Sequence, residues 1–171
     1  MWVALDDTDV PPGAQSPALS FEAIGLPSVV TYYAGGHFPP SPYEPIEEPV
    51  PARTPREVLG ANAVRGQIVG IDAIPSARSP TGLLERLIGL QAQACGDLAW
   101  ITSAGVCQSL QVKLDHAQRA LTEGKAKDAR NHLEAFLQEL EAQHGPEPGK
   151  HVTDNAYWLL KVNAEYILGR L

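Results

Sequence analysis

The sequence predicts a mainly α-helical protein, with a small four-helix bundle over residues 79–171 that follows a proline-rich extended arm with short β-strands over residues 1–78. Two observations predict this division. Thirteen of the fifteen prolines lie in residues 1–80, where each proline inside a helix would cost about 3 kcal/mol. In the second half, apolar residues recur at helical spacing, which is typical of amphipathic helices packed on one another.

Short extended segments are expected in the arm. The best strand candidate is Ser28–Tyr33, because it is rich in β-branched and aromatic residues and is followed by two glycines. Three other stretches have strand-like composition: Trp2–Leu5, Ser20–Ile24 and Gln67–Ile71.

Prolines dominate the stretch from Phe38 to Pro51, which favours polyproline-like or irregular backbone. Such a stretch is typical of a linker or of an arm that lies on a neighbouring surface. It also resembles the proline-rich ligands of peptide-binding domains, so both interpretations remain open.

The first helix is expected to begin at Ser79 and Pro80, since serine is a preferred N-cap and proline fits the first helical turn. It should end near Cys95 and Gly96. Further apolar stripes predict three more helices, over residues 106–121, 126–140 and 153–168, with Gly124 and Gly145 ending the second and third.

Charge and hydropathy exclude several classes of protein. A formal net charge of −7 argues against a basic nucleic-acid surface. No run of 18 apolar residues is present, so we expect no membrane span, and the first residues do not form a signal peptide. The chain taken literally would stay in the cytoplasm, although Met1 leads directly into a strand-like segment, as in a piece of a longer protein.

Motifs for catalysis are missing from the sequence, so we predict no enzyme, no catalytic residue, no cofactor and no metal site. Two patterns could nevertheless bind a metal ion. The acidic run Asp6–Asp9 could suit calcium, but an acidic turn is the commoner meaning. Asp128 and His132 share a helix face that a metal could bridge, whereas a solvated face is more usual.

Exposed aromatic residues are the candidates for a contact surface. Tyr157 and Trp158 are adjacent on the last helix and point about 100° apart, so one should be buried and the other exposed. Trp100 lies between the first two helices, either as a lid over the bundle or as a contact for a partner. Tyr32 and Tyr33 belong to the best strand candidate of the arm.

The two cysteines, Cys95 and Cys107, are twelve positions apart and have no zinc-like spacing to histidines. From the residues alone, one disulfide and two reduced, buried thiols are equally consistent with the pattern.

Four blocks in the second half occur in a recognisable order: SLQVKLDHAQ at 109–118, ARNHLEAFL at 129–137, GKHVT at 149–153 and AEYI at 164–167. They resemble the SLxxKLxxAQ, AxxxLxxFIxxV, GKxIT and DAexLI elements of the FIMAH domain family, over roughly residues 81–171. The sequence departs from this pattern at Leu137, Leu140 and Asn163, and in a short insertion around Pro146–Pro148.

The resemblance implies a non-catalytic helical accessory module near the C-terminus of a larger bacterial protein, at the cell surface or outside the cell. Its partners would be preceding domains of the same polypeptide, or other surface proteins or glycans. An exported setting favours a Cys95–Cys107 disulfide across the first helical hairpin, worth about 3 kcal/mol. Val3–Asp7 is similar to the last strand of carbohydrate-binding-type β-sandwiches, which implies that residues 1–78 end such a domain.

Two alternative functions accompany this interpretation. The chain could be a self-assembling structural subunit, a homo-oligomer in which the N-terminal arm adds strands to a neighbouring copy. It could also be a metal-dependent enzyme that builds its site from tertiary contacts alone.

Overall fold

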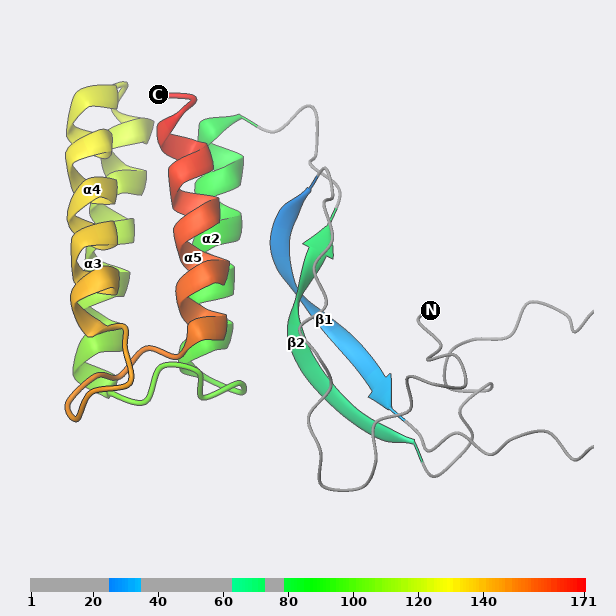
Figure 1. The fold of residues 1–171 in the computed structure, drawn as a ribbon. Helices are drawn as coiled ribbons and strands as arrows, with labels where there is room; N and C mark the ends of the chain where they lie inside the picture. Colours follow the sequence, from blue (N-terminus) through cyan, green and yellow to red (C-terminus); the bar gives the residue numbers. More distant parts are fainter. Residues whose placement is uncertain (1–24, 35–62, 73–78) are drawn as a thin grey trace, which may run out of the picture. The chain divides into compact units, whose positions relative to one another are not determined.

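The structure is a computed structural model that describes residues 25–34, 63–72 and 79–171. Two strands precede four helices in the described residues (Figure 1): β1 (Leu26–Ala34), β2 (Val64–Asp72), α2 (Pro80–Cys95), α3 (Ala104–Thr122), α4 (Ala126–Gln143) and α5 (Asp154–Leu168). The predicted fold class, mainly α with a small bundle and preceding strands, is confirmed.

Each helix begins and ends close to its predicted position. Three helices start with a hydroxyl side chain that accepts a hydrogen bond from a backbone N–H of the first turn. The Ser79 hydroxyl accepts from the N–H of Gly82, the Ser103 hydroxyl from that of Val106, and the Thr153 hydroxyl from that of Ala156. Before α4, Gly124 has φ of +73°, a conformation that glycine adopts without strain.

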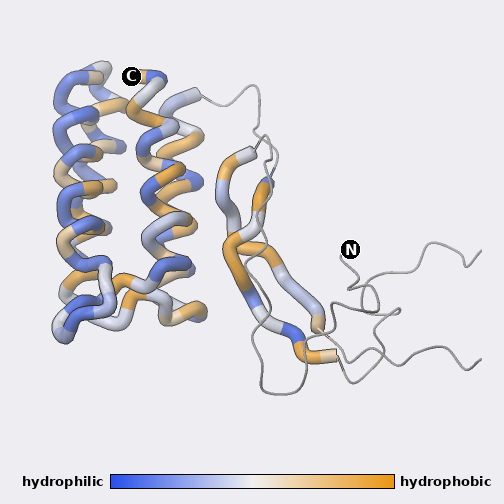
Figure 2. The backbone as a smooth tube through the Cα atoms, viewed as in Figure 1, coloured by the Kyte–Doolittle hydropathy of each residue, from blue (hydrophilic) through white to orange (hydrophobic). Residues whose placement is uncertain are grey.

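One core lies between the four helices. Helix α3 packs against α2 and α4, and α5 packs against the same two helices. Hydrophobic and hydrophilic residues alternate around each helix (Figure 2), so that each contributes an apolar stripe to the centre. The largest fully buried side chains are Leu84, Leu87, Leu110, Leu114, Leu133, Phe136, Leu140, Leu159, Leu160 and Ile167.

β1 and β2 form a two-stranded antiparallel sheet, which confirms the strand candidates Ser28–Tyr33 and Gln67–Ile71. Gly66 lies under the ring of Tyr32, where a Cβ atom would be 2.5 Å from the ring. The candidates Trp2–Leu5 and Ser20–Ile24, the stretch from Phe38 to Pro51 and the acidic run Asp6–Asp9 lie outside the described residues.

Residues 25–31 and 67–72 belong to the same compact unit as the helices, whereas the ends of the strands at 32–34 and 63–66 belong to a second unit. Within the first unit, the side chain of Leu26 is only 3% exposed and is part of the helical core. The start of β1 is therefore packed into the bundle.

Candidate interaction surface around Tyr157 and Trp158

Tyr157 and Trp158 divide as their positions on the helix predict. Tyr157 is 4% exposed and belongs to the core, whereas Trp158 is 53% exposed. The two rings meet edge to face, with centroids 5.0 Å apart. The buried ring of Tyr157 thus packs edge to face against the exposed ring of Trp158, and this geometry stabilises aromatic pairs.

The imidazole of His144 covers Tyr157 from the end of α4. The two rings are stacked, with centroids 3.9 Å apart and planes 7° apart. Nε2 of the same histidine lies 2.7 Å from Oδ1 of Asp154, in the first turn of α5. His144 therefore joins the C-terminal end of α4 to the beginning of α5.

The hydroxyl of Tyr157 is the centre of a polar network. It donates to Oε2 of Glu141 at 2.6 Å and accepts from Nζ of Lys161 at 2.7 Å. The hydrogen bond from Tyr157 lowers the pKa of Glu141, and the nearby Lys161 ammonium lowers it further. The bond to the Tyr157 hydroxyl likewise raises the pKa of Lys161.

Lys161 also lies close to the indole of Trp158, with Nζ 5.7 Å from the ring centroid. Cations at this distance are attracted to the face of an aromatic ring. Trp158 thus offers an apolar ring bordered by fixed charges.

The other candidate contact residues lie elsewhere. Trp100 is partly buried against the core in the α2–α3 loop. Its backbone bonds to Ala94 and Thr153, which places it across the end of the bundle as a lid. Tyr32 is exposed and Tyr33 partly buried, both on β1.

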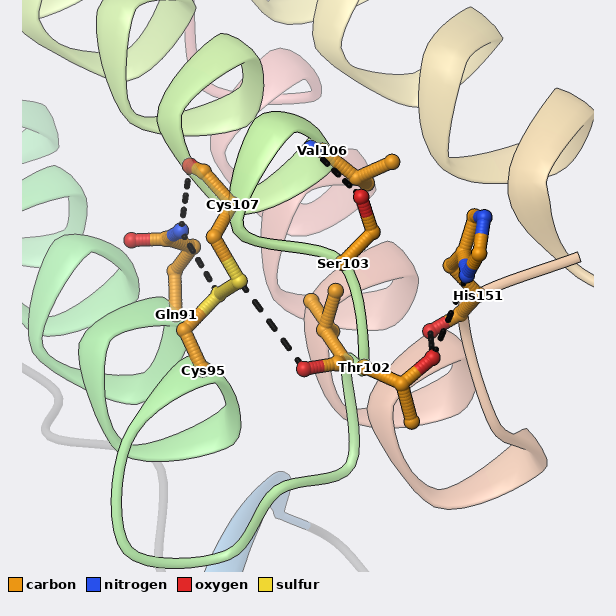
Figure 3. Close-up of a disulfide and its surroundings, with 8 residues drawn as sticks. Gln91, Cys95, Thr102, Ser103, Val106, Cys107 and His151 are labelled. Atoms are coloured by element: carbon orange, nitrogen blue, oxygen red, sulfur yellow. Dashed lines mark hydrogen bonds between the residues drawn. A yellow bond between two sulfur atoms is a disulfide. The ribbon is translucent and has the colours of Figure 1, made fainter.

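A disulfide links Cys95 at the end of α2 to Cys107 in the first turns of α3 (Figure 3), with Cα atoms 5.9 Å apart. This confirms the disulfide that the family resemblance implied. Gln91, which is 2% exposed, donates from Nε2 to the carbonyl oxygen of Cys107 at 3.0 Å and to Sγ of Cys95 at 3.2 Å. Its position four residues before Cys95, on the apolar face of α2, was the one sequence signal for this role.

The part of the chain that follows Cys95 matches a known protein family. Residues 96–169 match the FIMAH domain family. The resemblance stated from the four sequence blocks is therefore confirmed. No curated protein and no solved structure matches the chain. The matched residues contain α3, α4 and α5, and the disulfide connects them covalently to α2.

On the α3–α4 side of the matched residues, His116 and His132 meet edge to face with ring centroids 5.2 Å apart. They line a shallow hollow of about 300 Å³ together with Asp128. Across residues 25–34, 63–72 and 79–171, no group of three or more His, Cys, Asp or Glu side chains is arranged to hold a metal ion.

None of the described helices is long and apolar enough to cross a membrane.

Proposed function

We propose that this chain is a non-catalytic accessory module of a larger exported bacterial protein, and that it acts at the cell surface or outside the cell. The match of residues 96–169 to the FIMAH domain carries the proposal. The exposed Trp158, held by buried Tyr157, is the proposed contact surface. Its partners would be preceding domains of the same polypeptide, surface proteins or glycans rather than nucleic acid, given the net charge of −7.

The disulfide supports the exported setting. Disulfides persist in oxidising compartments and are rare in the cytosol, where thiol reductants keep cysteines reduced. Cys95 and Cys107 are bonded in a geometry that requires no movement of the backbone, since their Cα atoms lie within the usual range.

Fractionation of the native cells tests this proposal. An antibody against residues 79–171 should detect a polypeptide longer than 171 residues outside the cytoplasm. Mass spectrometry after alkylation without reductant should find Cys95 and Cys107 unlabelled. A cytoplasmic polypeptide of this length with both thiols alkylated would contradict the proposal.

Exposed apolar residues on β2 favour a second candidate function, self-assembly by strand addition. Val64, Ile68 and Ile71 are all exposed in a sheet of two strands, and such sheets are marginally stable alone. Size-exclusion chromatography with light scattering should then give an oligomer that Ile68→Lys disrupts, with Val112→Lys on α3 as the control. A wild-type monomer at high concentration would exclude self-assembly.

A further inference from the structure

The buried amide of Asn163 connects the FIMAH domain to the strand segment that precedes it. Asn163 lies on α5 and is 3% exposed. Its Nδ2 donates to the carbonyl oxygen of Leu159, one turn earlier, at 2.7 Å and to the carbonyl oxygen of Pro27 at 2.9 Å. Both amide protons are therefore used, one within the helix and one on a residue 136 positions away in the sequence.

We propose that α5 forms a docking site for an extended peptide segment, with Asn163 as its hydrogen-bond donor, and that its occupant is the start of β1, residues 26–31 of the same chain. This inference rests on the proposed accessory role and names the partner that the module binds. A polar side chain in an apolar core is costly unless it is hydrogen-bonded. One amide proton of Asn163 is satisfied within α5 by Leu159, and the second has its partner only when the backbone of Pro27 is in place.

Apolar contacts on both sides of this bond define the rest of the site. Leu26 is fully packed in the helical core, and Pro27 is buried beside it. Val29, two residues further along the strand, packs against the same core. The alternation of Pro27 and Val29 along one strand face gives a row of apolar side chains that an extended segment, but not a helix, can present.

Strand β2 makes the contact with α2. Nη1 of Arg86 lies 3.2 Å from Oδ2 of Asp72 at the end of β2, and the Arg86 side chain is only 11% exposed. Val69 of the same strand also packs against the core. The two strands are thus held at separate helices, β1 by Asn163 on α5 and β2 by Arg86 on α2.

The chemistry of the site favours one kind of ligand group, a backbone carbonyl without a hydrogen-bond partner. A neutral amide donor facing apolar side chains recognises a free backbone carbonyl, and a helix has no such carbonyl in its interior because each one is already bonded. A Leu-Pro step suits the site because proline has no N–H group that burial would leave without a partner. The site therefore holds residues 26–31 against α5.

Hydrogen–deuterium exchange on the full 171-residue chain tests this docking site. In Asn163→Leu, which keeps the side-chain size but removes the donor, amides of residues 26–31 should exchange about tenfold faster. Amides of α3 and α4 should keep their wild-type protection. The matched control is Asn131→Leu on the exposed face of α4, which should leave the exchange of β1 unchanged.

Unchanged protection of residues 26–31 in Asn163→Leu would overturn the proposal. An equal rise across all four helices would also overturn it, because Asn163 would then stabilise the core in general. These results do not depend on where the protein is located, so they stand apart from the fractionation experiment.

A second variant keeps the proposal testable if Asn163→Leu fails to fold. Leu26→Ala removes only the occupant's side chain, so it should speed exchange both in β1 and in the α5 amides around Asn163. Val112→Ala, an exposed position on α3, is its control. Wild-type protection of α5 in Leu26→Ala would show that the strand segment does not occupy the site.

Discussion

Tyr157 and Trp158 are neighbours on α5, yet one side chain is buried and the other is exposed. The rotation between neighbouring positions sends Tyr157 into the core and Trp158 to the surface. The sequence predicted the division but could not predict which ring is buried, since both are large and amphipathic. Contacts from Glu141 on α4 and from His144 directly after α4 decide it, because they supply a hydrogen-bond acceptor and a stacking partner for the tyrosine.

Alanine substitution should distinguish these two residues. Tyr157→Ala should lower the free energy of unfolding by about 3 kcal/mol, since it leaves a cavity in the core. Trp158→Ala should change it by less than about 0.5 kcal/mol, as expected of an exposed position. Urea unfolding followed by circular dichroism measures both. Comparable losses in the two variants would mean that Trp158 is a structural residue and not a free contact surface.

The pKa of Glu141 should report the Tyr157 hydrogen bond. In the folded protein this pKa is below its ordinary value of 4.5, so the contribution of Glu141 to stability is present above pH 4.5 and is lost as the pH falls through the lower, folded value. Tyr157→Phe removes the largest cause of the shift and should raise the pKa towards 4.5. A carboxyl-carbon NMR titration measures it, with Tyr166→Phe on the same helix as the control.

At the scale of elements, the α2–α3 hairpin connects the residues that match the FIMAH family to α2, which lies before them. The matched residues begin at Gly96, directly after α2 ends at Cys95. The disulfide and the bond from Gln91 to Cys107 both connect α2 with α3. The periodicity of the sequence located both helices, whereas the Gln91 contact required knowledge of how their faces meet.

Removal of the disulfide should weaken this hairpin. Cys95→Ala combined with Cys107→Ala should lower the free energy of unfolding by about 3 kcal/mol, because the cross-link closes a short loop in the unfolded chain. Guanidinium unfolding of the double variant and of the wild type, with and without reductant, checks this. A reductant effect that persists in the double variant would show that the loss has another origin.

At the scale of the whole molecule, the helices and the start of β1 share one core. Leu26 is buried among helical side chains, although it precedes the first described helix by more than fifty residues. The sequence placed a boundary between residues 78 and 79, where composition changes. The start of β1 lies before this boundary, yet it packs against the helices of the bundle.

Residues 79–171 produced alone should therefore be helical but less stable than the full chain. The fragment keeps the apolar stripes of all four helices, yet it lacks Leu26, whose burial is worth about 2 kcal/mol. Circular dichroism and thermal unfolding compare the two. A fragment without helical signal would contradict a self-contained bundle, and an unchanged Tm would contradict a stabilising role for β1.

The sequence by itself determined the local structure. Apolar spacing, the caps at Ser79 and Thr153, and the glycines between helices fix where each helix begins and ends, because these signals act between near neighbours in the chain. The ordered blocks at residues 109–167 were sufficient to indicate the FIMAH family.

Only the tertiary structure decided which distant groups meet. Asn163 stood out in the sequence as a departure from the family pattern, and no local rule explained it. Its reason is the carbonyl of Pro27, brought to α5 by the packing of Leu26 into the core. Contacts of this kind depend on the three-dimensional arrangement of elements far apart in the chain, which local periodicity and propensity do not encode.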